Sequence, residues 1–330
     1  MQFLSQNLQR YLIVWLLAGS GLALWWPQLA GNGLAVDPFL AGRTSLAWII
    51  ALTMFSIGWM LPRDEVANVL RRWPAILGGV AVQYVTMPCL AFGIGRLMGL
   101  SGDTLVGVVM VGCVPGAMAS NVLTLNAKGN VSFSVSLTTV ATLVSPLVVP
   151  IILKLALIAD DSVDTGILVD GSIRLLTQVV IPVIAGHAVG RWFSVYQDVS
   201  RQIGSIIANL AILWIIAVVV GMNREKLLGA SNHFVPSIPT DLVITLVSIN
   251  VGGYLSGFGC GCLLGLPAGM RRALTLEVGM QNAGLGAVLA SQLFRDHPET
   301  AIPCALYTFG CMFSGTFLAR YWSITASSES

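Results

Sequence analysis

Long apolar segments alternate with short polar connections along the whole chain. Charged residues and turn residues at their edges separate ten such segments. A helix needs roughly 20 apolar residues to cross a bilayer, so the pattern predicts an all-α polytopic membrane protein with ten transmembrane helices. The segments cover residues 11–29, 44–62, 73–95, 104–127, 131–158, 172–190, 204–222, 240–265, 273–294 and 300–322.

The composition excludes a soluble globular protein. Hydrophobic residues make up 55% of the 330 residues and charged residues 10%, against about 25% charged residues in ordinary soluble domains. The mean hydropathy is +0.82. A net charge of +2 offers no basic surface for nucleic acid. The six cysteines fall in apolar segments without zinc-site spacing, so we expect them to be packed core residues.

The distribution of basic residues predicts the orientation in the membrane. Ten spans put both termini on one side, and a cytoplasmic N-terminus gives cytoplasmic loops most of the basic residues. The acidic residues Asp160, Asp161, Asp164 and Asp170 then lie outside, as do Arg224 and Lys226 against the trend. We therefore expect a multi-pass protein of a bacterial cell inner membrane with both termini inside. The loops in question carry Arg63, Arg71, Arg72, Lys128, Arg191, Arg201, Arg271 and Arg272.

The segment spacing indicates an inverted repeat. Segments three to five begin near residues 73, 104 and 131, and segments eight to ten begin near 240, 273 and 300. Each half holds five spans, so the second half enters the membrane in the opposite sense. The predicted halves are residues 1–165 and 166–330. Transporters built in this way place their sites near the membrane midplane, where matching helices of the two halves are interrupted.

Segments four and nine contain the residues expected to interrupt a helix. Segment four carries Pro115 and Gly116 in its middle, and segment nine has three glycines and several polar residues within 277–286. A break exposes backbone carbonyls that must find partners in protein, water or a bound cation. Both segments are therefore predicted to be broken helices beside a cation site.

Glu277 is the one acidic residue that we place inside a predicted span. An intramembrane carboxylate is a functional candidate, and Gln281 lies one turn away on the same helix face, followed by Asn282. The alternative is an ion pair with the nearby Arg272. The three adjacent oxygen-bearing groups favour a monovalent cation site, with Glu277 supplying the negative charge.

Other polar residues admit two interpretations each. Ser134, Thr138 and Thr142 share one face of segment five, either as contacts between helices or as cation ligands. Gln83 is an isolated amide that serves either packing or binding. A stripe at Gly253, Gly257, Gly261 and Gly265 predicts close helix packing. His187, His233 and His297 have no ligand-like spacing.

Two long motifs resemble the bile acid:sodium symporter family. The first comprises Pro115-Gly116, residues 119–122, residues 129–131 and Ser134, and the second is the run 277–282. The resemblance implies two inverted five-helix repeats, divided into a core domain and a panel domain, with helices four and nine unwound where they cross. It also implies coupling to two sodium ions.

The same resemblance implies which residues hold the ions. One sodium site uses Ser120, Asn121, Ser134, Thr138 and Glu277. The other uses Gln83, Glu277 and Gln281 with the backbone carbonyls of Val278 and Met280. Every side-chain position carries a suitable oxygen.

The expected substrate side departs from the family pattern. Ala117 and Met118 replace part of a Gly-Gly-Thr run that bacterial relatives often carry, and Cys311-Met312 replaces a His-Asn pair. These four residues and Asn282 are the predicted substrate contacts. Methionines favour adaptable apolar contact, which weakens the case for a small hydroxy-acid such as pantoate. An organic anion remains the predicted class, because two sodium ions against one Glu277 leave a positive excess.

The predicted function is sodium-coupled import of an organic anion, such as a bile-acid-like carboxylate or sulfonate, by alternating access. Net inward movement of one positive charge gains about 2.3 kcal/mol per 100 mV. No obligate protein partner is predicted beyond the lipid bilayer. One alternative is a proton-coupled or sodium-independent carrier or exporter of the same fold, with Glu277 titrating. A remoter alternative is a prenyltransferase-like enzyme, because residues 160–164 form a DDxxD motif; such enzymes need a second acidic cluster, which we do not find.

Overall fold

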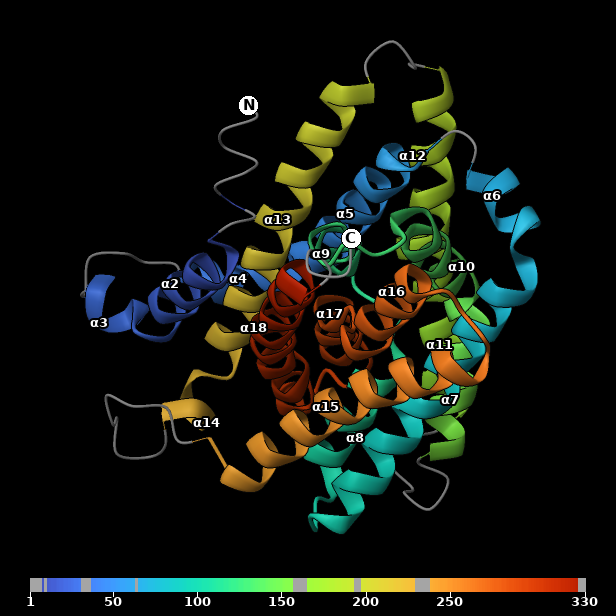
Figure 1. Cartoon of the computed structure of the whole chain (residues 1–330). Coiled ribbons are helices and arrows are strands. Elements are labelled where there is room, and N and C mark those ends of the chain that lie inside the picture. Colours follow the sequence, from blue (N-terminus) through green and yellow to red (C-terminus); the bar gives the residue numbers. More distant parts are fainter. Residues whose placement is uncertain are drawn as a thin grey trace.

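The computed structural model describes residue 8 and residues 11–30, 37–62, 65–156, 165–192, 197–228 and 238–325, and the regular elements of this part of the chain are all helices (Figure 1). The acidic motif residues Asp160, Asp161 and Asp164 lie outside the described residues, as do Arg63 and His233. The first half contains α2 (Leu12–Leu24), α3 (Trp26–Ala30), α4 (Pro38–Ala41), η2 (Gly42–Ser45), α5 (Leu46–Met60), α6 (Glu65–Arg71), α7 (Trp73–Leu97), α8 (Gly102–Cys113), α9 (Ala119–Asn126) and α10 (Val131–Ala156). The second half contains α11 (Thr165–Leu175), η3 (Leu176–Val180), α12 (Ile181–Trp192), α13 (Gln197–Met222), α14 (Arg224–Leu228), α15 (Thr240–Leu263), α16 (Ala268–Gly279), α17 (Ala283–Leu293), η5 (Pro298–Ala301) and α18 (Ile302–Thr325).

Seven helices among the described residues are long and apolar enough to cross a membrane. They coincide with predicted segments two, three, five, six, seven, eight and ten. The breaks predicted in segments four and nine are present, between α8 and α9 and between α16 and α17. The helix of segment one ends early, at Leu24, and this end was not predicted from the sequence. Pro27 lies in the following short helix and cannot donate a backbone hydrogen bond to the preceding turn.

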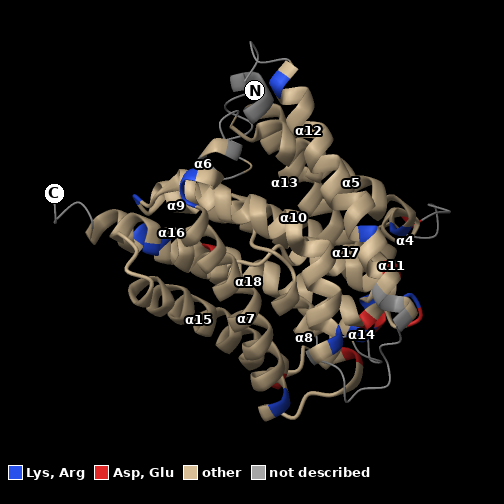
Figure 2. Ribbon diagram, turned by 90° about the vertical axis from the view of Figure 1, so that its right-hand side faces the viewer, with Lys and Arg blue, Asp and Glu red and all other residues tan. Residues whose placement is uncertain are grey.

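The connections meet at two ends of the helix bundle. At the first end, Asn130 N donates to Gly269 O (2.8 Å) and Arg72 Nη1 lies 3.4 Å from Asn130 Oδ1, so the connections after α6 and α9 lie beside the start of α16. At the second end, Arg43 of η2 donates to the backbone carbonyl of Arg295 (2.9 Å). Figure 2 shows the charged residues gathered toward these ends, whereas the middle of the bundle is almost free of them. This distribution suits a protein whose middle faces lipid.

Arg224 and Lys226, the two basic residues that the predicted orientation places outside, have acidic partners at the second end. Arg224 Nη1 bonds to Asp37 Oδ2 (2.9 Å) and its Nη2 donates to Ala23 O (2.6 Å), while Lys226 forms an ion pair with Glu299. Because each basic side chain is paired with a carboxylate, its presence on the predicted outer side adds little net charge there.

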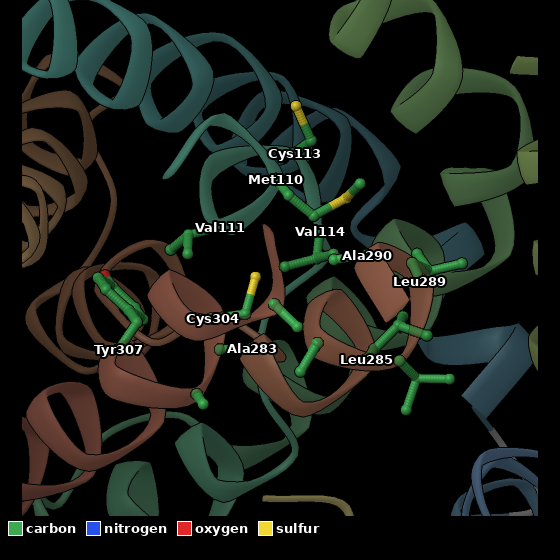
Figure 3. Close-up of a cluster of buried hydrophobic side chains, with 14 of the residues drawn as sticks. Met110, Val111, Cys113, Val114, Ala283, Leu285, Leu289, Ala290, Cys304 and Tyr307 are labelled. Atoms are coloured by element: carbon green, nitrogen blue, oxygen red, sulfur yellow. The ribbon is translucent and has the colours of Figure 1, made fainter. Parts of the chain in front are cut away.

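The helices form two groups by contact. The four-helix group consists of α2, α5, α12 and α13, in which α13 packs against both α2 and α5, and α12 packs against α5. We count with this group η2, α11, η3 and α14, which adjoin these helices along the chain. The crossing group consists of α7–α10 and α15–α18. Its interior is a cluster of buried apolar side chains from α8, α17 and α18, including Met110, Leu285, Leu289 and Cys304 (Figure 3). This packing holds the two broken helices in fixed positions.

The glycine stripe of α15 provides close packing at three of its four predicted positions. A Cβ added at Gly253, Gly257 or Gly261 would lie within 3.2 Å of an atom of α16, which belongs to Gly279, Thr275 and Arg271, respectively. The prediction was wrong for Gly265, which follows the helix, has φ +64° and faces open space. A glycine there ends α15, because L side chains disfavour that left-handed conformation.

Candidate cation and substrate site

The two helix breaks pair with each other at the centre of the crossing group. Ala117 N donates to Met280 O (2.8 Å), and Asn282 N donates to Pro115 O (2.8 Å). Gly116 and Gln281 thereby form an isolated antiparallel bridge. Backbone groups freed by one break thus satisfy those freed by the other, as a low-dielectric environment requires.

Glu277 projects into this crossing and is fully buried. Ser120 Oγ donates to its Oε2 at 2.5 Å, and Thr138 Oγ1 donates to its Oε1 at 2.6 Å. Among the described residues, no basic side chain forms an ion pair with it. The alternative of a pair with Arg272 is wrong, because Arg272 Nη1 donates instead to the backbone carbonyl of Ala127 (3.3 Å).

Gly116 is required where the first break approaches Glu277. A Cβ built at Gly116 would lie 2.1 Å from Glu277 Oε1 and 2.5 Å from its Cδ. No side chain fits at that position while the carboxylate stays in place. The lack of a side chain at Gly116 therefore leaves the space that the Glu277 carboxylate occupies.

The oxygen groups predicted for the first sodium site lie around this carboxylate. Thr138 Oγ1 is 3.5 Å from Asn121 Oδ1. Ser134 lies one turn earlier on α10, and its Oγ accepts from Thr124 Oγ1 (3.3 Å). Thr124, which is fully buried, was not predicted from the sequence. Its position one turn after Ser120 on the same helix is the signal that could have identified it.

The residues predicted for the second sodium site form a neighbouring buried group. Gln83 Nε2 is 3.4 Å from Gln281 Oε1, which joins α7 to the second break. Gln281 Nε2 in turn donates to Val278 O (2.7 Å), while Met280 O accepts from Ala117 N. Hydrogen bonds thus link Gln83, Gln281 and Val278, and both backbone carbonyls are bonded to protein donors.

A further polar network supports the end of α16 and was not anticipated. Gly279 O accepts from Asn250 Nδ2 and from Tyr307 OH, both at 2.8 Å. Ser314 Oγ donates to Asn250 Oδ1 (2.7 Å) and lies 3.0 Å from Tyr254 OH. Two helices, α15 and α18, thereby satisfy one carbonyl released by the break.

A cavity of about 530 Å³ lies beside the crossing, between the two helix groups. All five predicted substrate residues line it: Ala117, Met118, Asn282, Cys311 and Met312. Its other walls include Met54 of α5, Val135 of α10 and Asn209 of α13. The lining continues to the first end at Pro62 and Val131, and it contains no charged side chain among the described residues. The cavity can therefore hold a largely apolar molecule in contact with the polar crossing.

Polar contacts join the two helix groups at the opposite, second end. Arg43 reaches the carbonyl of Arg295, Lys226 pairs with Glu299, and Arg174 Nη1 lies 3.4 Å from Gln292 Oε1. None of these residues lines the cavity. Asp103, His297 and Glu299 also gather here within 4.8 Å of one another, although the histidine spacing gave no sign of it.

Comparison with known proteins identifies the family. Residues 47–230 match the Sodium Bile acid symporter family. The chain is 35% identical to an uncharacterised sodium-dependent transporter, YocS, of Bacillus subtilis over 93% of this chain and 92% of the relative. It is 27% identical to a probable chloroplastic sodium/metabolite cotransporter of Arabidopsis thaliana, over 99% of this chain and 77% of that relative. It is 29% identical to the human ileal sodium/bile acid cotransporter, over 84% of this chain and 78% of that relative. The chain therefore belongs to the sodium bile acid symporter family of membrane transporters and is not an enzyme.

Proposed function

We propose that the protein is a sodium-coupled symporter that imports an organic anion by alternating access. The observation that carries the proposal is the fully buried Glu277, which accepts two hydroxyl hydrogen bonds at the crossing and has no basic partner among the described residues. A buried carboxylate without a counter-charge costs several kcal/mol of effective desolvation. Monovalent cations bound by the surrounding oxygens would offset that cost.

The two sodium ions would share Glu277. The first would also use Ser120, Asn121, Ser134 and Thr138, whose oxygens lie around the carboxylate. The second would also use Gln83 and Gln281 with the carbonyls of Val278 and Met280. Those two carbonyls already accept protein hydrogen bonds, so sodium would bind through their second lone pairs or replace these bonds.

The anion would bind in the cavity next to the crossing. The α9 helix begins at Ala119 and α17 begins at Ala283, and both residues line the cavity. Helix N-termini favour anionic groups, and two sodium ions near one carboxylate add positive charge. Met118 and Met312 would contact the apolar body of the substrate. A carboxylate or sulfonate with a sizeable apolar part therefore suits the site best.

Alternating access is supported by the asymmetry of the two ends. The cavity reaches from the crossing to the first end, while polar contacts join the helix groups at the second end. With the first end in the cytoplasm, this is an inward-facing arrangement of a core (the crossing group) and a panel (the four-helix group). We propose ten spans in two inverted halves, residues 1–165 and 166–330, in which α8–α9 corresponds to α16–α17.

Proteoliposomes loaded with potassium test this function. Uptake of labelled taurocholate, and of aliphatic carboxylates of increasing length, is measured after an inward sodium gradient is applied, with a potassium buffer as the control. Ser120→Ala removes a hydroxyl that bonds to Glu277, whereas Ser145→Ala removes a buried hydroxyl whose one bond among the described residues is to Thr142 O of its own helix. We expect sodium-driven uptake of at least one anion, reduced about tenfold in Ser120→Ala and unchanged in Ser145→Ala.

The alternative of a proton-coupled carrier is tested in the same vesicles. An inward proton gradient without sodium should drive no uptake if sodium is the coupling ion. Uptake driven equally well by the proton gradient, and indifferent to sodium, would replace the proposal with that alternative.

A further inference from the structure

One polar side chain of the cavity wall belongs to the most hydrophobic span of the protein. An 18-residue window within residues 202–222 of α13 has a mean hydropathy of 2.6, the highest among the seven candidate spans. Asn209 lies within this stretch, lines the cavity and is half-buried, with Ser205 one turn away on the same wall. An amide in such a segment calls for a polar partner.

Packing between helices does not supply that partner. The recorded bond of Asn209 runs from its Nδ2 to Ser205 Oγ on its own helix, at 3.4 Å. Its Oδ1 has no partner among the described residues, although an amide can donate two hydrogen bonds and accept two. The amide of Asn209 thus retains most of its hydrogen-bonding capacity for something in the cavity.

Several other polar side chains of the wall already bond to the protein backbone. Thr53, Thr308 and Thr316 each donate to the carbonyl four residues earlier on their own helix, at 2.7–3.0 Å. Asn282 Oδ1 caps α17 by accepting from Leu285 N (3.1 Å). Asn209, by contrast, has no side-chain bond to the backbone or to another helix among the described residues.

Asn209 lies about one helical turn from the crossing, on the opposite helix group. Ile212 packs beside the second break, since a Cβ at Gly284 would lie 3.3 Å from Ile212 Cγ1. Asn209 precedes Ile212 by three residues, which is about 4.5 Å along the helix axis toward the first end. A molecule whose anionic group sits at the crossing would place another part of its body against Asn209.

We propose that Asn209, supported by Ser205, is a specificity-determining residue that hydrogen-bonds a second, uncharged polar group of the transported anion. The preferred substrates are then organic anions that carry a hydroxyl or amide group on their apolar body. Analogues that lack this group leave the amide unpaired and bind less well, because a site built to hydrogen-bond a substrate hydroxyl rejects the analogue without it. The inference rests on the proposed function, since it takes the cavity to be the substrate site.

The test compares two acids that share one skeleton. Cholate carries hydroxyl groups that 5β-cholanate lacks, and the binding of each to purified protein is measured by its stabilisation against heat in saturating sodium. We expect wild type to bind cholate more tightly, and Asn209→Leu to weaken cholate binding about tenfold with little effect on cholanate. Thr316→Val, which removes a self-satisfied hydroxyl of the same cavity, should leave the preference intact.

Two results would overturn the inference. The first is that wild type binds cholate and 5β-cholanate equally well, or binds neither. The second is that Asn209→Leu keeps the wild-type preference for cholate. Stabilisation by sodium alone is measured in the same samples and does not involve Asn209. Its absence in folded wild type would remove the proposed function itself, so the two failures are distinguishable.

Discussion

At the residue scale, one charge determines the chemistry of the site. Glu277 is fully buried at the crossing of two broken helices, and it accepts hydrogen bonds from Ser120 and Thr138. Neutral hydroxyls reduce the cost of burying the carboxylate but do not balance its charge. The proposed sodium ions supply that balance, so sodium binding and the placement of Glu277 should depend on each other.

Gly116→Ala should disrupt the cation site without touching a ligand. The added methyl group would lie 2.1 Å from Glu277 Oε1 and must displace the carboxylate. We expect sodium affinity to fall at least tenfold, a shift of about 1.4 kcal/mol, as measured by thermal stability against sodium concentration. Gly259→Ala is the matched control, because a Cβ at that exposed helix position meets nothing within 4 Å. Wild-type sodium affinity in Gly116→Ala would contradict the assignment.

The sequence indicated most residues of the candidate site but missed some of its polar support. Glu277 and Gln281 stood out because a carboxylate and an amide one turn apart are rare inside an apolar segment. Thr124, Asn250 and Tyr307 did not, because an isolated polar residue in a span does not reveal which neighbour it faces. Three-dimensional packing alone brings them to the helix breaks.

At the element scale, the fold depends on two helices that stop and restart. Pro115-Gly116 and the glycines of 279–286 predicted the interruptions, since proline removes a donor and glycine tolerates irregular backbone. The pairing of Gly116 with Gln281 was not visible from spacing, because it requires the two breaks to meet across 165 positions of chain. The glycine stripe was misassigned at Gly265 for a related reason: a helix C-terminus and a packing surface both favour glycine.

Asn282→Ala should weaken the restart of the second broken helix. Asn282 Oδ1 accepts from Leu285 N at the N-terminus of α17, and loss of such a cap costs about 1 kcal/mol. We expect a lower midpoint of thermal unfolding in detergent. Asn282→Ser keeps an acceptor and should recover most of the loss. An alanine variant as stable as wild type would show that the cap contributes nothing to stability.

At the scale of the whole molecule, the two ends of the bundle are in different states. The cavity reaches the first end, and three polar contacts join the helix groups at the second end. Opening of the second end to the outside would have to break those contacts. They are proposed to stabilise the inward-facing arrangement.

Lys226→Glu tests this proposal, because it places two carboxylates together at Glu299. We expect the population to shift toward an outward-open state. A cysteine is introduced by Thr316→Cys at a cavity position on α18. Maleimide reaches this thiol from the first end, and we expect it to label the thiol several-fold more slowly in Lys226→Glu. Cys89 and Cys262 are exposed and not packed in the core as expected, and Cys260 is half-buried. These three thiols and that of the cavity residue Cys311 are removed by substitution with serine beforehand.

The charge swap Lys226→Glu with Glu299→Lys is the control, because it restores an attractive pair. Labelling should return toward the wild-type rate. If Lys226→Glu and the charge swap are both labelled at the wild-type rate, the contact between residues 226 and 299 does not control access to the cavity.

The central claim is that Glu277 holds sodium, and thermal stability tests it most directly. Purified wild type and Glu277→Gln are heated at increasing sodium concentration, with potassium at equal ionic strength as control. A ligand that binds only the native state stabilises by about 2.7 kcal/mol at 100 times its dissociation constant. We predict sodium-specific stabilisation of wild type that is absent from a folded Glu277→Gln. Equal effects of sodium and potassium on wild type, or full sodium stabilisation of the variant, would contradict the claim.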